Sequence, residues 1–470
     1  MESTHSENSR DNHNAIVDSF VLDMPGARVR RLTVGWLLLS LGALVIGGLF
    51  SLLIVLSRTP YFQGIIPWTD FFHSALVVHV DMTVLVWFLG FAGVLWSLNS
   101  SQSCIRCGWF ALALSVLGTA VMTVAPFFGA AEPLMNNYVP VLQHPLFLFG
   151  LGLFGLGFTV LVIKGLFFSH SVGSTISGEG ALRFGLYTAL IAAFVSIGVL
   201  IISYSDIPMF ATGAYYYELL FWDAGHTLQF MHIQLLLVSW LWMTTVAGIG
   251  LKLSPRVALI IFAIGLLPVI LTPFVYMMFD LGAAMHKQSI SFVMQYGGGL
   301  AALPVGLIIV LGLLNKNRRD LKVGPEFNAL VFSMLLFGVG GVIGFMISGS
   351  DVTVPAHYHG SIVAITLAYM GVTFHILPRL GFKAIKGKWA TRQPVIYACG
   401  QLMHVIGLVL SGGYGVQRKT AGIEQDLNNL ERVIGMGIMG LGGLIAIIGG
   451  IMFLVIVFKS MWPQKKNQTI

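Results

Sequence analysis

Charged side chains are scarce in this sequence of 470 residues, because Asp, Glu, Lys and Arg make up only 10% of it. A soluble globular protein carries about 25% of them, so this chain lacks the polar surface that a soluble fold of its length needs. Cysteine is rarer still, and three cysteines cannot build a disulfide framework. The 55 glycines follow no three-residue period, which excludes a collagen-like chain. With 56% hydrophobic residues, the composition predicts a polytopic membrane protein.

The apolar residues gather in twelve runs, and a helix needs roughly 20 such residues to cross a bilayer. The runs cover residues 32–57, 71–98, 108–128, 139–168, 183–204, 217–250, 256–279, 289–314, 327–348, 354–378, 393–413 and 433–458. We therefore expect an all-α fold, with a twelve-helix transmembrane domain over residues 32–460. Residues 1–31 are polar, have no signal-peptide layout and predict a disordered cytoplasmic tail, and residues 461–470 predict a second cytoplasmic tail.

The lysines and arginines are distributed unequally between the two sides of these spans. Of the 26 basic residues, 21 lie in the two termini and in the loops that follow the even-numbered spans up to the tenth. Basic residues accumulate on the cytoplasmic side of membrane proteins, so both termini are predicted to be cytoplasmic. The net charge of +7 is then a topology signal and requires no nucleic-acid partner.

Histidines recur at one depth, close to the outer ends of the spans. A single intramembrane histidine is usually a satisfied core group, but six at one depth are hard to explain in that way, and neutral imidazole is the commonest metal ligand. They are His79, His144, His226, His286, His357 and His359. Residues two apart on a helix are rotated by about 200°, so His357 and His359 are expected to serve different metal centres. Two neighbouring haems on either side of the tenth span fit this pattern.

At these residues the sequence resembles the haem–copper oxidase superfamily, namely subunit I of cytochrome c oxidases and the large subunit of nitric oxide reductases. The most specific segments are AHYHG (356–360), WDAGH (222–226) and ILPRLGF (376–382). The resemblance implies that His79 and His359 are the axial ligands of a low-spin haem and that His357 is the proximal ligand of a high-spin haem. It also implies that His226 and His286 hold a second metal, copper or non-haem iron, facing the high-spin haem.

The sequence departs from this family at the second metal. Oxygen reductases usually place two adjacent histidines after the seventh span, whereas His286 stands between Met285 and Lys287, so only two protein ligands are clear. His232 lies about 240° around the helix from His226 and is expected to have a core or haem-contact role. Gln229, one turn from His226, is a candidate to approach the metal.

The tyrosine that many oxygen reductases carry four residues after the histidine of the sixth span is replaced here by Phe230. Tyr276, in the seventh span, is either its substitute or a packing residue. Both alternatives remain open from the sequence.

Acids and lysines that bring protons from the cytoplasm in oxygen reductases are also missing, since residues 289–314 contain no Lys, Asp or Glu. The acids near the histidines lie toward the outer side, where they either cap helices and bond haem propionates or take up external protons. They are Asp81, Glu218, Asp223 and Asp280. The pattern favours a divergent member closer to nitric oxide reductases, which reduces NO to N₂O; O₂ reduction to water is the alternative.

The same residues indicate the partners of this chain and the other classes of protein to which it could belong. We expect a bacterial inner-membrane protein in the lipid bilayer, with a subunit II-like electron-input protein that carries a copper centre or c-type haem. Cytochrome c or quinol is the expected donor. A proton-coupled secondary transporter is a remote alternative, although transporters bind near the midplane; a family member that holds haem but no second metal is another. Cys104 and Cys107 form a weak zinc motif, and a reduced pair is expected.

Overall fold

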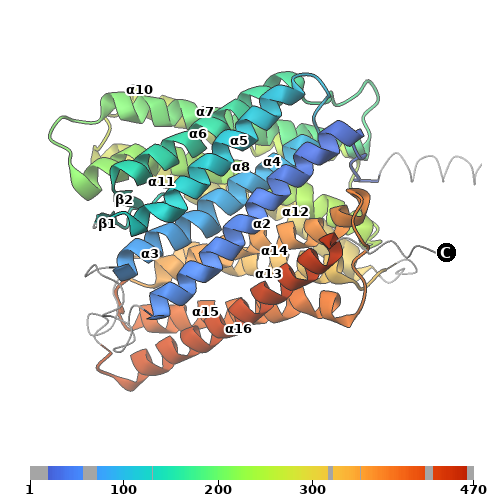
Figure 1. Cartoon of the computed structure of the whole chain (residues 1–470). Coiled ribbons are helices and arrows are strands. Elements are labelled where there is room, and N and C mark those ends of the chain that lie inside the picture. Colours follow the sequence, from blue (N-terminus) through green and yellow to red (C-terminus); the bar gives the residue numbers. More distant parts are fainter. Residues whose placement is uncertain are drawn as a thin grey trace, which may run out of the picture. The chain divides into compact units, whose positions relative to one another are not determined.

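The computed structural model describes residues 19–56, 71–129, 131–315, 321–349, 351–418 and 427–462. Helices dominate this part of the chain (Figure 1). They are α2 (Ala27–Leu56), α3 (Phe71–Val80), a π-helical turn (Asp81–Val86), α4 (Trp87–Leu98), α5 (Ile105–Val124), α6 (Pro145–Phe168), α7 (Gly178–Asp206), α8 (Gly213–Val246), α9 (Pro255–Ile264), α10 (Leu267–Met278), α11 (Ala284–Gly297), α12 (Gly299–Leu314), α13 (Pro325–Met346), α14 (Thr353–Arg379), α15 (Lys388–Gly413) and α16 (Leu430–Met461). The long apolar runs of the sequence therefore form helices, as expected.

Eleven helical segments of the described residues are long and apolar enough to cross a membrane, one fewer than the twelve predicted. The predicted span that is missing from these eleven is 217–250, which corresponds to α8. This helix has 34 residues, or roughly 50 Å at 1.5 Å per residue, so its length is ample. Its polar side chains lower its hydropathy, among them Asp223, His226, Gln229 and His232. The span that is missing is thus one that carries a candidate ligand, His226.

Helices α2 to α11, apart from the last residues of α8, belong with most of α12 to the first of two compact units, which comprises residues 1–238 and 252–311. Within it α2 packs against α3 and α4, and α5 packs along α6. A short antiparallel hairpin that the sequence did not predict joins α5 to α6 (Figure 1). Its strands are β1 (Glu132–Leu134) and β2 (Val141–Gln143), with Pro133 opposite Leu142. The hairpin brings residues 135–140 to the end of α8, as described below.

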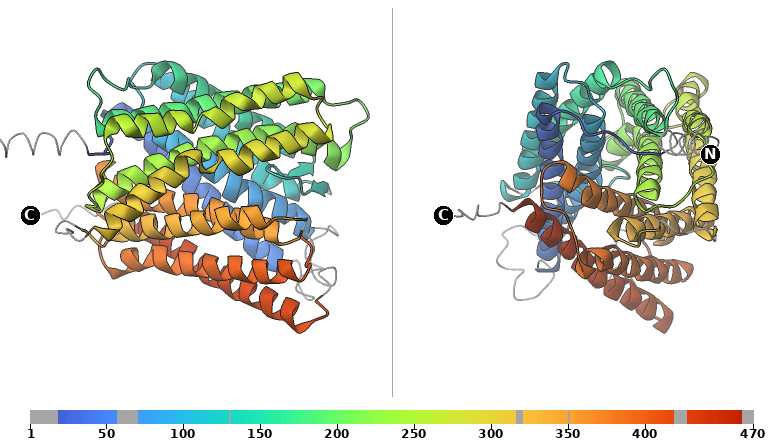
Figure 2. Two further views of the ribbon diagram at one scale, coloured as in Figure 1. Left: turned by 180° about the vertical axis from the view of Figure 1, so that it is seen from behind. Right: turned by 90° about the vertical axis from the view of Figure 1, so that its right-hand side faces the viewer.

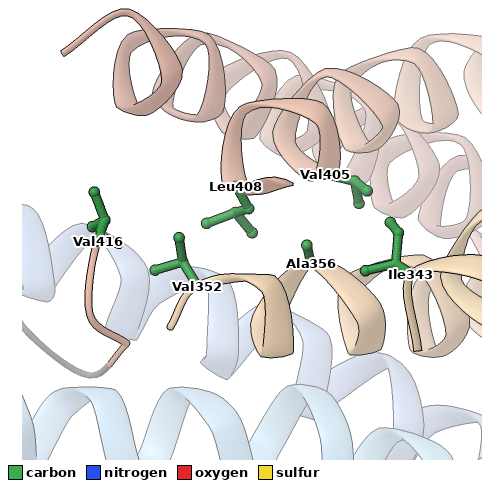
Figure 3. Close-up of a cluster of buried hydrophobic side chains, with 6 residues drawn as sticks. All are labelled: Ile343, Val352, Ala356, Val405, Leu408 and Val416. Carbon is green, nitrogen blue, oxygen red and sulfur yellow. The ribbon is translucent and has the colours of Figure 1, made fainter. Parts of the chain in front are cut away.

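The second unit comprises residues 239–251 and 312–470, and α13 to α16 form most of it. Helices α15 and α16 lie side by side along their length, as the orange and red ribbons of Figure 2 show. A cluster of buried aliphatic side chains joins α13, α14 and α15 (Figure 3). Its members are Ile343, Val352, Ala356, Val405, Leu408 and Val416. This apolar contact positions the first turns of α14, where His357 and His359 lie.

Three local predictions differ from the structure. Helix α2 begins at Ala27, and Phe20 and Leu22 are buried, so the described end of the predicted tail at 1–31 is packed against the protein. His144 does not lie inside a span: it is the N-cap of α6, and its Nδ1 accepts a hydrogen bond from the Leu146 amide. Cys104 and Cys107 are joined in a disulfide rather than reduced. Residues 1–18 and the end of the second tail, 463–470, lie outside the described residues.

Candidate functional site

Helix α8 presents Asp223 and His226 on one face, because residues three apart on a helix are neighbours. Both side chains are buried, with exposed fractions of 1% and 8%. The Nδ1 of His226 lies 2.8 Å from the carbonyl oxygen of Trp222 one turn back. A carbonyl oxygen can only accept, so Nδ1 carries the proton and Nε2 keeps its lone pair. His226 is therefore oriented as a metal ligand requires.

The carboxylate of Asp223 joins two other elements. The Nε2 of His286, in the first turn of α11, lies 2.6 Å from Oδ2 of Asp223. The hydroxyl of Tyr276, on α10, donates to the same oxygen at 2.5 Å and lies 2.6 Å from the Oγ of Ser203 on α7. The ring of Tyr276 also meets the ring of His286 edge to face, with centroids 4.8 Å apart. The structure thus brings together His286, Asp223 and Tyr276 from three helices.

One oxygen of this buried carboxylate has no partner. Among the described residues, no donor reaches Oδ1 of Asp223. The Nδ1 of His286 is held at 3.1 Å by the carbonyl oxygen of Phe279. An unpaired buried polar atom costs about 1–3 kcal/mol and calls for an explanation.

Tyr138, in the loop between β1 and β2, packs on His226. Its ring meets the His226 ring with centroids 4.9 Å apart, and a Cβ on Gly225 would overlap the Tyr138 ring. Burial raises the pKa of Tyr138, and the charges of Glu218 and Asp223 raise it further. The phenol therefore stays protonated over the physiological range and closes the site as a neutral group.

His79, at the end of α3, is oriented by α2. Its Nδ1 lies 2.8 Å from the carbonyl oxygen of Gly47 and 3.0 Å from the hydroxyl of Ser51. The π-helical turn begins two residues later with Asp81, which is fully buried. Both oxygens of Asp81 lack a hydrogen-bond partner within the described part of the chain. Such π-helical turns are frequent at functional sites.

His357 and His359 point to different helices, as their spacing predicts. The Nδ1 of His357 lies 2.7 Å from the carbonyl oxygen of Gly340 on α13. The ring of His359 instead meets the ring of His404 on α15, with centroids 4.6 Å apart. This contact depends on the register of α15 against α14, which the sequence does not show. The structure makes His404 a direct neighbour of a candidate haem ligand.

Four of the five candidate ligands share one hydrogen-bonding pattern. In His79, His226, His286 and His357, Nδ1 is bonded to a backbone carbonyl oxygen. Metal-ligating histidines almost always donate their other ring nitrogen in this way. In His79, His226 and His357 the remaining ring nitrogen, Nε2, is then the one available to a ligand, whereas in His286 Nε2 contacts Asp223.

His404 shares this pattern, because its Nδ1 lies 3.0 Å from the carbonyl oxygen of Met439. Two other buried histidines differ from it. The Nδ1 of His375 lies 3.1 Å from an Arg379 nitrogen, and in His232 no described residue pairs with Nδ1. His232 packs edge to face on Phe88, in agreement with a core role. Gln229 is half-buried on α8 and stays a prediction. Within the described residues, no three His, Cys, Asp or Glu side chains are already gathered as a metal site.

Known proteins resemble this chain over most of its length. A family model described as cytochrome c and quinol oxidase polypeptide I matches residues 31–452. An uncharacterized protein of Rickettsia prowazekii (strain Madrid E) is 28% identical in an alignment of 500 positions that covers 92% of this chain and 96% of its relative. An uncharacterized protein of Aquifex aeolicus (strain VF5) is 30% identical over 360 residues, which are 75% of this chain and 86% of its relative.

A solved structure has the same fold. A heme-copper terminal oxidase dimer determined by cryo-EM matches with a TM-score of 0.68 and 17% identity, over 94% of this chain and 85% of that one. The family match and the shared fold agree with the resemblance stated on the histidine motifs. The chain therefore belongs to the cytochrome c and quinol oxidase polypeptide I family, and it is an oxidoreductase of the haem–copper oxidase superfamily.

Proposed function

We propose that this chain is the catalytic subunit of a respiratory terminal reductase that reduces NO to N₂O. The observation that carries the proposal is the shared pattern of His79, His226 and His357, whose Nδ1 atoms are bonded to backbone carbonyl oxygens. Each of these rings leaves Nε2 for a metal. This supports two haems and a second metal, as the family implies.

The resemblance assigns the haem sites to the following residues. His79 and His359 would hold the low-spin haem, and His357 would hold the high-spin haem. The carbonyl oxygen of Gly340 fixes the ring of His357. Gly344 leaves room for that ring, since a Cβ there would lie 2.8 Å from Nδ1 of His357. By the same resemblance His226, whose Nδ1 is bonded to the Trp222 carbonyl oxygen, and His286 would hold the second metal.

The choice of NO over O₂ is supported by the residue at position 230. Reduction of O₂ takes four electrons, and many family members draw one of them from a tyrosine at this position. Here the residue is Phe230, which is buried and cannot supply one. Coupling of two NO molecules to N₂O and water needs only two electrons and two protons.

The hydrogen bond that Tyr276 donates to Asp223 supports the delivery of these protons from the outer side. Ser203 lies in the last turn of α7, which ends at the exposed Asp206. Its hydroxyl is bonded to Tyr276, and Tyr276 donates to Asp223 beside His286. When bound, the haem iron and the second metal supply electrons and Lewis acidity to the substrate. The side chains of this relay hold and move protons, and the buried surroundings exclude water.

One observation favours O₂ reduction as a second candidate. Tyr276 lies one hydrogen bond from the carboxylate that is paired with His286, so a redox-active phenol is present close to the site. In that case Tyr276→Phe abolishes O₂ turnover. If the chain reduces NO, the variant slows turnover through the relay but retains activity.

The test uses the protein purified from membranes together with whatever subunits remain bound to it. We expect a reduced-minus-oxidised spectrum with a six-coordinate haem band that disappears in His79→Ala and in His359→Ala. Turnover is then measured with NO and with O₂ separately, for the wild type and for Tyr276→Phe. A wild-type protein that reduces O₂ but not NO overturns the choice of substrate, and the absence of haem overturns the reductase.

The cellular setting is part of the proposal. The eleven apolar segments support a multi-pass protein, which we place in the bacterial cell membrane with both termini in the cytoplasm. A subunit II-like protein with a copper centre or a c-type haem would pass electrons from cytochrome c or quinol. Co-purification of such a subunit, and its reduction before that of the chain's own haems, is the expected result.

A further inference from the structure

We propose that Tyr138 is a positioning residue for the second metal, because its ring holds the imidazole of His226 in the orientation that ligation requires. The inference rests on the proposed function, since it takes His226 as a ligand of that metal. Tyr138 lies in the hairpin between α5 and α6, outside the helices that carry the candidate ligands.

The imidazole of His226 lies against two aromatic rings. Its centroid is 4.5 Å from that of Trp222, one turn earlier on α8, and 4.9 Å from that of Tyr138. The Tyr138 and Trp222 rings also meet edge to face, with centroids 6.3 Å apart. The carbonyl oxygen of Trp222 holds Nδ1 of His226, so α8 restrains the imidazole from within the helix and Tyr138 restrains it from another element. A change in the orientation of the imidazole therefore disturbs both contacts.

Gly225 provides the space that Tyr138 occupies against α8. A Cβ at this position would lie 2.2 Å from Cγ of Tyr138 and 2.6 Å from its Cδ1 and Cδ2. Any side chain at position 225 must therefore displace the phenol ring. Glycine is less favourable than alanine inside a helix, so α8 carries an unfavourable residue at the position where this ring packs.

Asn137 anchors the loop to the same face of α8. Its backbone N–H donates to Oε2 of Glu218 at 3.1 Å, and its Nδ2 donates to Oε1 at 2.5 Å. Residues four and seven apart on a helix share a face, so Glu218, Trp222 and Gly225 form one stripe of α8. The carboxylate of Glu218 thus fixes the loop on this stripe directly before Tyr138.

The backbone of Tyr138 is strained. Its φ of +67° lies in the left-handed region, which is uncommon for a bulky side chain. The N–H of Val139 donates to the carbonyl oxygen of Asn137 at 2.9 Å, so Tyr138 is the central residue of a three-residue γ-turn. Strained residues persist only where the surrounding structure enforces them, and they cluster at active sites and ligand clamps. This favours a clamp on His226 over ordinary loop packing.

The contact is made by the ring of Tyr138, which determines how it can be tested. Phenylalanine keeps the ring and removes only the hydroxyl group. Asparagine removes the ring but visits the left-handed backbone conformation more readily than most residues do, so Tyr138→Asn keeps the turn. Gly225→Ala acts from the other side of the contact, because it displaces the ring without changing Tyr138.

The test measures how firmly the purified protein, with its bound subunits, retains copper or non-haem iron against increasing concentrations of a chelator. The variants are Tyr138→Phe, Tyr138→Asn, Gly225→Ala and the matched control Gly198→Ala on α7, whose Cβ would meet nothing within 4 Å. Haem per chain and the midpoint of thermal unfolding are measured alongside. Tyr138→Phe and Gly198→Ala should retain the metal as the wild type does. Tyr138→Asn and Gly225→Ala should lose it at a chelator concentration about tenfold lower, with their haem content unchanged, as loss of an outer-shell partner does.

The other outcomes contradict the inference in different ways. Wild-type retention of the metal in both Tyr138→Asn and Gly225→Ala overturns the positioning role. A loss in Tyr138→Phe as large as that in Tyr138→Asn shows that the hydroxyl group is required and overturns a role of the ring. If Gly225→Ala also loses haem, Tyr138→Asn decides, and a parallel loss of haem and of thermal stability there assigns the contact to folding alone. Haem without a second metal in the wild type overturns the inference, whereas a wild type without haem overturns the proposed function itself.

Discussion

Single residues at the candidate site are placed by contacts with backbone atoms. His357 illustrates this, because its ring lies between the carbonyl oxygen of Gly340, at 2.7 Å, and the Cα of Gly344. A side chain at Gly344 would occupy the space of the imidazole. The residue at position 344 therefore affects the position of His357 only through the space that its side chain occupies.

The first prediction compares two glycines of α13. A Cβ on Gly344 would lie 2.8 Å from Nδ1 and 2.9 Å from Cε1 of His357, whereas a Cβ on Gly341 meets nothing within 4 Å. Both substitutions to alanine raise helix propensity equally. We expect Gly344→Ala to displace His357 and to lower high-spin haem content severalfold, and Gly341→Ala to leave it unchanged. Pigment analysis per chain and the spectrum of the reduced protein with carbon monoxide check this; equal haem in both variants would contradict it.

Whole elements approach each other closely where small residues allow it. Helices α15 and α16 pack along their length with glycines at the contact. A Cβ on Gly407 would lie 2.6 Å from the carbonyl oxygen of Gly435 and 2.8 Å from the Cα of Met439. Close backbone approach of this kind is typical of membrane helix pairs. The helices can then gain dispersion contacts that lipid does not offer.

The second prediction concerns the stability of this pair. Gly407→Ala forces backbone against backbone, and overpacking costs about 1–3 kcal/mol. Gly437→Ala, on α16, is the control, because its Cβ meets nothing within 4 Å. We expect a lower midpoint of thermal unfolding in detergent for Gly407→Ala only. The same midpoint in both variants would show that this contact contributes little to the stability of the protein.

At the scale of the whole molecule, the distribution of basic residues predicts the orientation of the chain in the membrane. The loop after α5 should be external and the loop after α6 cytoplasmic. Phe128 and Ser174, in these two loops, are both exposed in the structure. They offer matched positions for labelling from either side.

The third prediction uses these two positions in a chain whose native cysteines are replaced by serine. An impermeant maleimide should label Phe128→Cys in intact spheroplasts. It should label Ser174→Cys only after the membrane is permeabilised. Labelling in the reverse order would show that the topology is inverted and that the histidines lie near the cytoplasmic surface.

The amino-acid sequence by itself determined the membrane class, nearly every span and the rotation between His357 and His359. These depend on local apolar runs and on the period of the helix, which involve only neighbouring residues. It also placed His226 and His286 as candidates, but it grouped Asp223 with three other acids and left the role of Tyr276 open.

Only the tertiary structure decided which of these side chains meet. Asp223 and His286 are 63 residues apart, and Asp223 and Tyr276 are 53 apart. Their contacts depend on how α8, α10 and α11 pack, and no local pattern in the sequence encodes this. The same holds for His404 beside His359, and for the carbonyl oxygens that orient His79 and His357. Local periodicity thus determines which faces of the helices the histidines occupy, while helix packing determines which side chains meet and which ring nitrogen is left without a backbone partner.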